Sequence, residues 1–241
     1  MKKQTGSTPA SRRFHLIAVS AFVISALAIA SYYIVSPPAA RGVSTGVVIS
    51  QVYGGGGNTG ATFKNDFIEL FNRGASAVNV TGWTVQYAAA GGTSWTNSTA
   101  LTGTIQPGHY YLIQEAAGAG GTTNLPTPDA TGSIAMAAGA GKVALVNNGT
   151  ALTGNGCPFA ASVVDFVGYG TGTGGANCSE TSPAPTLTNT TADLRASAGC
   201  TDTDNNSADF SSGAPNPRNS SSAAQSCGGW PCVKATLQFG Q

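Results

Sequence analysis

The sequence predicts an all-β domain, an antiparallel β-sandwich, on the strength of three observations. Short apolar runs alternate with Gly- and Asn-rich segments throughout the chain after residue 45. No stretch of that region repeats its apolar residues with a helical period. The dipeptides Pro107-Gly108 and Asn148-Gly149 are typical of turns between antiparallel strands. A hydrophobic content of 41% against 9% charged residues is sufficient for a core built from short strands.

The apolar runs define the expected strands in order. Eight are predicted: residues 47–53, 66–72, 83–88, 100–105, 110–114, 133–137, 142–147 and 162–169.

The second predicted strand carries apolar side chains on both of its faces. Side chains alternate along a strand, so Phe67 and Phe71 point to one face while Ile68 and Leu70 point to the other. A strand that is apolar on both faces is expected at the centre of a sheet. Trp83 opens the next strand, and we expect it to fill the core together with Phe67 and Phe71.

The N-terminal segment, residues 1–35, is predicted to direct export. Residues 16–35 contain no charge and follow four basic residues. A basic flank before an apolar stretch keeps the N-terminus in the cytoplasm and sends the following chain across the membrane. The basic residues are Lys2, Lys3, Arg12 and Arg13.

The sequence leaves the fate of this segment open. The small residues 28–30 offer a cleavage site, which would give a secreted protein, but the apolar stretch is also long enough to anchor the chain in a bilayer. Both outcomes place the remainder outside the cytoplasm. Residues 36–45 are predicted to be a linker, 46–219 the folded domain, and 220–241, rich in Ser and interrupted by Pro, a disordered tail.

The charge of the exported part argues against nucleic-acid binding. The whole chain has a net charge of +1, with eleven basic and ten acidic residues. Four of the eleven precede the apolar stretch, which leaves seven bases against ten acids, or −3. Affinity for a phosphate backbone depends on clustered Lys and Arg, which a mildly acidic domain does not provide.

All five cysteines lie in the second half of the chain, beyond the export segment. Outside the cytoplasm this arrangement favours disulfides. We predict that Cys157 pairs with Cys178 across a Gly-rich loop. Cys200 is expected to pair with either Cys227 or Cys232, and an odd count leaves one thiol over.

One acidic run has the spacing of a calcium loop. Asp202, Asp204, Asn206 and Asp209 supply oxygen donors at its first, third, fifth and eighth positions, and Ca²⁺ binds six to eight oxygens. The run departs from an EF-hand because Ser207 stands where Gly is required and no Glu closes the loop. Asp and Asn also form turns by bonding to their own backbone, so a calcium site and a structural turn both remain open.

Three sequence patterns match catalytic motifs, but the predicted structure around them does not. Residues 42–46 spell Gly-x-Ser-x-Gly and residues 55–60 spell Gly-x-Gly-x-x-Gly, yet each is followed by a strand where its motif requires a helix. His109 opens a strand with no nucleophile or orienting acid indicated nearby. We therefore expect no catalytic machinery and no cofactor.

Six motifs in a fixed order resemble the lamin tail domain. They are Val-Ile-Ser-Gln-Val-Tyr at 48–53, Asp-Phe-Ile-Glu-Leu-Phe-Asn at 66–72, Gly-Trp-Thr-Val at 82–85, Leu101, Pro-Gly-His-Tyr-Tyr-Leu-Ile at 107–113 and Val-Val-Asp-Phe-Val-Gly-Tyr-Gly at 163–170. The blocks 202–210 and 215–219 are similar to the end of the bacterial exported version, so the resemblance covers residues 47–219. It implies an immunoglobulin-like β-sandwich without catalytic residues.

The predicted function is that of a non-enzymatic, extracytoplasmic binding module, secreted or at the cell surface. Its partner is expected to be a protein or an envelope carbohydrate. The long loops at residues 54–65, 89–99 and 116–131 are the expected contact loops. Trp95, in the second of them, is either an exposed contact residue or packed under its own loop.

An alternative rests on the resemblance, since bacterial lamin tail domains often accompany extracellular hydrolases. In this alternative the chain is the targeting portion of an extracellular nuclease or phosphatase, and the catalytic domain lies outside this sequence.

Overall fold

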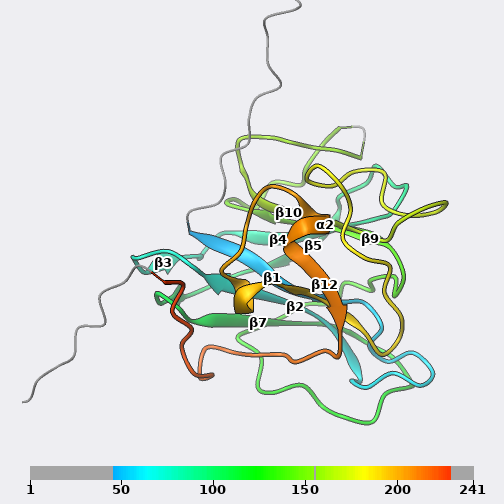
Figure 1. The fold of residues 1–241 in the computed structure, drawn as a ribbon, viewed down its shortest axis with the longest axis horizontal. Coiled ribbons are helices and arrows are strands. Elements are labelled where there is room, and N and C mark those ends of the chain that lie inside the picture. Colours follow the sequence, from blue (N-terminus) through cyan, green and yellow to red (C-terminus); the bar gives the residue numbers. More distant parts are fainter. Residues whose placement is uncertain (1–45, 155, 229–241) are drawn as a thin grey trace, which may run out of the picture. The chain divides into compact units, whose positions relative to one another are not determined.

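The computed structural model describes residues 46–154 and 156–228, which form a β-rich domain with almost no helix. The predicted export segment and linker lie outside the described residues. Among those residues, no helix is long and apolar enough to cross a membrane. The elements (Figure 1) are β1 Val47–Tyr53, β2 Asn65–Asn72, β3 Val78–Asn79, β4 Thr84–Ala89, β5 Asn97–Ala100, β6 Thr104–Ile105, β7 Tyr110–Ala117, β8 Ala130–Thr131, β9 Gly141–Val146, β10 Val163–Tyr169, β11 Ala192–Arg195, the 3₁₀ turn η1 Ser197–Gly199, α2 Asn206–Asp209 and β12 Phe210–Gly213.

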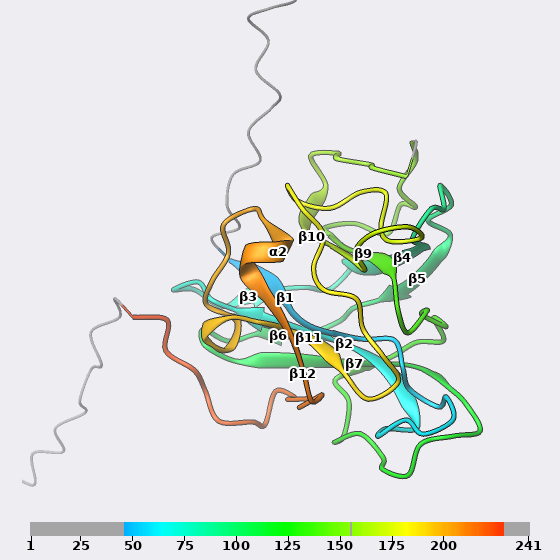
Figure 2. The ribbon, with the colours of Figure 1, turned by 45° about the vertical axis from the view of Figure 1, so that its right-hand side comes forward.

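Two larger sheets and a small ribbon make up the domain. The six-stranded sheet has the order β12-β11-β1-β2-β7-β8, and the four-stranded sheet has the order β10-β9-β4-β5. All strand pairs are antiparallel except β7 with β8. Figure 2 shows β10, β9, β4 and β5 grouped on one side and β1, β2, β7, β11 and β12 on the other. The prediction of an all-β, mainly antiparallel domain is confirmed.

Strand β2 lies between β1 and β7, at the centre of the six-stranded sheet. Its Ile68 and Leu70 side chains point into the main core, where they meet residues of the four-stranded sheet. Phe67 and Phe71 point to the opposite, outer face and are fully buried in two smaller aromatic clusters. Trp83 is only half-buried and packs against the margin of the main core.

The outer cluster of Phe71 and Tyr110 is covered by the chain that follows β12. Arg218 reaches back to the six-stranded sheet, where its Nη2 lies 2.7 Å from Oε1 of Glu69. The Arg218 guanidinium also stacks 3.8 Å from the ring centre of Tyr110. A cation that both pairs with a buried acid and covers an aromatic ring holds this segment on the sheet.

The described part of the predicted disordered tail, residues 220–228, is tied to the domain. Ser220 donates its backbone N–H to Asp129 at 3.0 Å, and Cys227 forms a disulfide with Cys200. Sequence had left Cys227 and Cys232 as alternative partners of Cys200, so the structure decides between them. The prediction of a disordered tail rested on Ser and Pro content, which gives no sign of these bonds to distant residues.

Several predicted strands differ from the structure for local reasons. The predicted strand 100–105 divides into β5 and β6 because Gly103 adopts a φ of +90°, which turns the chain. Residues 133–137 form no strand. Strands β11 and β12 were not predicted, because their short, polar sequences lack apolar alternation.

Candidate functional site

Four carboxylates surround one buried guanidinium where β10 lies beside β1 and β11. Arg195, only 2% exposed, points Nη2 at Oδ2 of Asp165 over 2.8 Å and Nη1 at Oδ1 of Asp202 over 3.1 Å. Oδ2 of Asp209 lies 3.5 Å from the same Nη1. Glu180 is the fourth acid whose charge acts on Arg195. We call these five residues the arginine cluster.

Arg195 also binds backbone and packs on an aromatic ring. Its Nε donates to the carbonyl of Ile49 at 2.8 Å, and its guanidinium lies 4.5 Å from the ring centre of Phe210. Burial acts to lower the pKa of Arg195, but the surrounding carboxylates outweigh it and raise the pKa. The guanidinium therefore stays charged inside the protein.

Asp165 is held on both of its oxygens. Oδ2 accepts the backbone N–H of Ile49 at 2.6 Å, and Oδ1 accepts that of Phe166 at 2.9 Å. Burial raises the pKa of Asp165, while Arg195 lowers it and Asp202 raises it again, so the result lies above the ordinary value. Asp165 thus connects β10 to both β1 and β11.

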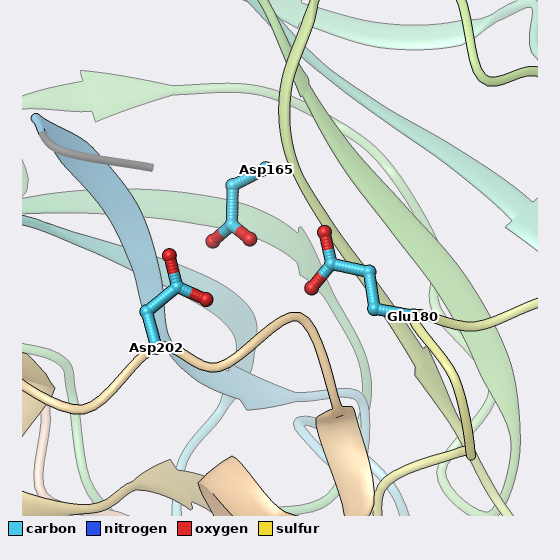
Figure 3. Close-up of side chains that lie close together, drawn as sticks. All are labelled: Asp165, Glu180 and Asp202. Atoms are coloured by element: carbon cyan, nitrogen blue, oxygen red, sulfur yellow. The ribbon is translucent and has the colours of Figure 1, made fainter. Parts of the chain in front are cut away.

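Three of these acids have the ligand chemistry of a hard-cation site. Carboxylate oxygens of Asp165, Glu180 and Asp202 lie within 4.8 Å of one another and turn towards a common space (Figure 3). However, the Arg195 guanidinium already contacts Asp165 and Asp202, and the side-chain amide of Asn206 donates to Oε2 of Glu180 at 3.0 Å. These contacts account for the group as an internal ion-pair and hydrogen-bond network.

The predicted calcium residues are brought to the same region but take different roles. Asp202 and Asp209 pair with Arg195, whereas Asp204 adopts a φ of +55° and its carbonyl accepts a bond from the Thr181 hydroxyl. Among the described residues, Asp202, Asp204 and Asp209 do not form a group of converging ligands. The run is therefore arranged as a turn whose acids serve Arg195.

Asn206 closes the open edge of β10. Its Oδ1 accepts the N–H groups of Gly168 at 2.9 Å and of Glu180 at 3.1 Å, and its Nδ2 donates to the carbonyl of Phe166 at 2.9 Å. The amide thereby supplies the bonds that a neighbouring strand would make, which protects a sheet edge from pairing with another chain.

Three further carboxyls are buried without a basic partner. Asp66, Glu115 and Asp193 are 4%, 1% and 0% exposed, and within the described part of the chain no basic side chain forms an ion pair with any of them. Burial raises the pKa of Asp66 to about 7 and that of Asp193 to about 8, and it also raises the pKa of Glu115. We call these three residues the inner carboxyls.

Two of the predicted contact loops lock together through their backbones. We call residues 54–64 and 118–123 the glycine loops. Gly118 donates to the carbonyl of Lys64 at 3.1 Å, and Gly120 donates to that of Gly57 at 2.7 Å. A Cβ on Gly57 would lie 2.1 Å from the backbone nitrogen of Gly118, so only glycine permits this approach.

The family model described as Lamin Tail Domain matches residues 41–171. The chain belongs to the lamin tail domain family. A solved structure of a DUF4876 family protein from Bacteroides thetaiotaomicron is similar in fold, with a TM-score of 0.53 and 14% identity over 76% of this chain and 75% of that one. No curated protein matches the chain.

The family match divides the arginine cluster of this lamin tail domain. Asp165 lies within the matched residues, while Glu180, Arg195, Asp202 and Asp209 follow them. The glycine loops lie inside the match, as do Asp66 and Glu115. The chain beyond residue 171 contributes β11 and β12 and thus completes the six-stranded sheet.

The remaining predicted contact loop, residues 89–99, lies on the outer face of the four-stranded sheet of the lamin tail domain. Its Trp95 is 1% exposed and packs 5.7 Å from Phe166 between ring centres, so the exposed alternative for Trp95 was wrong. The Lys142 ammonium lies 5.6 Å from the centre of the Trp95 ring. Cys157 and Cys178 form the predicted disulfide beside it. Burial against these neighbours leaves the indole no surface for a partner.

Lys142 is fully buried and donates to three oxygens. Its Nζ lies 2.7 Å from the carbonyl of Gly92, 2.9 Å from that of Gly156 and 2.6 Å from Oδ1 of Asn177. Burial lowers its pKa. One ammonium thus joins three loops over the four-stranded sheet.

Sequence reasoning missed the residues that organise both acidic regions of the lamin tail domain. Arg195 and Glu180 lie outside the predicted strands, and Asp193 neighbours Arg195 in the unpredicted β11. One signal was available. Ionisable residues inside otherwise apolar runs, as at Asp66 and Asp165, indicate buried charge.

Proposed function

We propose that this lamin tail domain is a non-enzymatic, extracytoplasmic binding module on an immunoglobulin-like two-sheet scaffold. Its two disulfides, Cys157–Cys178 and Cys200–Cys227, are consistent with a location outside the cytoplasm. Membership of the family supports an interaction role. The partner we propose is a protein or a carbohydrate of the cell envelope.

The observation that carries this proposal is the interlocking of the glycine loops. Besides the bonds already described, Lys64 donates to the carbonyl of Thr123 at 3.0 Å, and Phe63 forms a parallel bridge with Thr123. A surface fixed by its own backbone loses little conformational entropy when a partner binds. Loops held rigidly on a β scaffold commonly carry recognition.

Three exposed side chains of the glycine loops are polar. Asn58, Thr59 and Lys64 are exposed, and Asn58 is braced by a 3.2 Å bond from its Nδ2 to Oδ1 of Asn189. Asn189 in turn donates to the carbonyl of Thr59 at 3.0 Å. Such a surface offers donors, acceptors and one positive charge, which suits hydrogen-bonded contact with a polar partner.

Retention of the full chain on isolated cell envelopes tests the proposal. Thr59→Arg combined with Lys64→Glu changes the size and charge of the exposed loop surface without touching the backbone bonds. Thr173→Arg, at another exposed loop, is the matched control. We expect the double variant to reduce retention about tenfold, which corresponds to about 1.4 kcal/mol, while the control binds as the original chain does. Equal retention of all three proteins would overturn the proposal.

A second assay addresses catalysis. We expect the purified chain, supplied with Mg²⁺ or Ca²⁺, to hydrolyse neither nucleic acid nor a phosphomonoester. Hydrolysis that persists through further purification and disappears in a residue-specific variant would contradict the non-enzymatic assignment.

A further inference from the structure

Residues 133–137, which the sequence predicts to be a strand, form hydrogen bonds to two carboxyl side chains instead of to a neighbouring strand. We call residues 132–137 the crossing segment; they follow β8 and precede the turn into β9. The N–H of Ile134 donates to Oε2 of Glu115 at 2.9 Å, and the N–H of Met136 donates to Oδ2 of Asp66 at 2.8 Å. Two carboxyls thus take alternate N–H groups of an extended chain, as a partner strand would.

Both carboxyls come from adjacent strands at one irregularity. Asp66 lies in β2 and Glu115 in β7, where the register shifts between the pairs Asn65–Ala117 and Phe67–Gln114. Ile68 and Ile113, two residues away on each strand, belong to the main core. Side chains of one strand alternate between faces, so Asp66 and Glu115 point to the core side.

Each carboxyl has one oxygen that finds no hydrogen-bond partner. These atoms are Oδ1 of Asp66 and Oε1 of Glu115, and the Thr99 hydroxyl is likewise buried without a partner. Oε2 of Glu115 and Oγ1 of Thr99 both lie close to Gly132: a Cβ added to that glycine would be 2.3 Å from the first and 1.9 Å from the second. Burial raises the pKa of Glu115 and outweighs the Thr99 hydroxyl nearby, which favours the charged form of Glu115.

The surroundings of the pair contain acids and phenols. Asp193 of β11 and the hydroxyls of Tyr53, Tyr87 and Tyr169 are the other titratable groups there. The Tyr169 hydroxyl, whose pKa is raised by burial and then by Tyr87, Asp66 and Asp193, donates to the carbonyl of Ala137. The pKa of Tyr53 is raised mainly by burial and also by the charge of Asp66. No described basic side chain pairs with Asp66 or Glu115.

We propose that Asp66 and Glu115 each carry a proton in the closed fold, and that loss of these protons releases the crossing segment, making it a pH-sensitive latch. Two buried, neighbouring negative charges are not stable without a cation, whereas an opened segment lets water hydrate them. The latch goes beyond the proposed binding function and does not depend on it.

The pKa values give the sign and the range of the effect. Burial raises the pKa of Asp66 to about 7 from its ordinary value near 4, so the closed form binds a proton more tightly than the open form. Opening is therefore most unfavourable below about pH 4. Through Asp66 alone, opening becomes about tenfold more favourable for each pH unit up to about pH 7, above which this gain levels off, and a second proton released from Glu115 steepens the dependence.

Hydrogen exchange of the full chain, followed from about pH 5 to about pH 8, tests the latch. Protection factors already correct for the faster intrinsic exchange at high pH. We expect those of Ile134 and Met136 to fall at least about tenfold per pH unit up to about pH 7. Amides of Ala144 and Leu145, in the centre of β9, exchange through global unfolding and should stay more strongly protected than Ile134 and Met136 at every pH. Protection at residues 134 and 136 that is constant with pH, or that equals that of β9, would overturn the proposal.

Neutral isosteres sharpen the test. The Asp66→Asn and Glu115→Gln double variant keeps an oxygen for each N–H but cannot ionise, so its protection should be independent of pH. Asp129→Asn is the matched control, because Asp129 also accepts a backbone N–H, from Leu112 at 2.7 Å, but is only half-buried. The control should retain the original pH dependence. A double variant with undiminished pH dependence would contradict the latch, and if it does not fold, the original chain alone decides.

Discussion

The arginine cluster and the inner carboxyls contain the same kind of side chain at the same depth, but they differ in their counter-charge. In the first, Asp165, Asp202 and Asp209 face Arg195 over 2.8 to 3.5 Å. In the second, Asp66 faces no described cation. Burying a carboxylate is costly unless a positive charge or a proton compensates it. The difference indicates that this fold uses a guanidinium in one region and protons in the other.

The two regions also differ in what they hold. Arg195 connects β11 to β1 through Ile49, which is 146 positions away in sequence, and to β10 through Asp165. The inner carboxyls Asp66 and Glu115 instead hold the backbone of the crossing segment. Disruption of the first region should therefore destabilise the whole domain, whereas disruption of the second should begin locally.

Removing the cation from the arginine cluster should have the largest effect. In Arg195→Met, four buried acids lose their shared counter-charge, and we expect a loss of about 3–5 kcal/mol in the free energy of unfolding. Urea denaturation at pH 7 measures it. A loss below about 1 kcal/mol would mean that the two regions do not differ as described.

The pH profile of the original chain should show the inner carboxyls directly. Their pKa values are raised on folding, so their contribution is fully present below about pH 4 and is lost as the pH rises through about 7 for Asp66 and about 8 for Asp193. Asp66 alone should cost about 4 kcal/mol across this range. Urea denaturation at several pH values is the measurement, and stability that rises steadily from pH 5 to pH 8 would contradict it.

A variant of Asp193 separates its contribution to the pH dependence of stability from that of the other inner carboxyls. It is fully buried, and neither oxygen has a hydrogen-bond partner. Asp193→Asn removes one titrating group, so we expect the fall of stability between pH 5 and pH 8 to become shallower by about 1.4 kcal/mol per pH unit. An unchanged slope would show that Asp193 does not ionise differently on folding.

The smallest effect is expected at the rim of the arginine cluster. Arg73 reaches Asp202 with its Nη1 at 3.2 Å, but its side chain is 21% exposed. Partly exposed pairs contribute little because water screens them, so Arg73→Gln should cost about 1 kcal/mol or less. Urea denaturation of both variants under identical conditions is the measurement. If Arg73→Gln lowered the free energy of unfolding as much as Arg195→Met does, the important counter-charge would be Arg73 at the rim and not Arg195 at the centre.

The sequence alone determined the features that depend on local pattern. Alternating apolar residues identified β2 as a central strand, the order of motifs identified the lamin tail domain, and the spacing of Cys157 and Cys178 identified a disulfide. Each of these signals can be read from residue types and their order along the chain, without knowing which distant residues they contact. Local conformation and apolar alternation follow from the residues themselves, whatever they later contact.

Only the tertiary structure decided how the polar residues are used. The run around Asp202 has the spacing of a cation loop, yet its acids serve an arginine seven positions earlier, and Trp95 is buried beside Lys142 of another strand. Residues 133–137 have the pattern of a strand, but the carboxyls of Asp66 and Glu115 accept their N–H groups in place of a partner strand. A buried charge is stable only with the partner that the whole fold brings to it, and such partners come from distant parts of the chain.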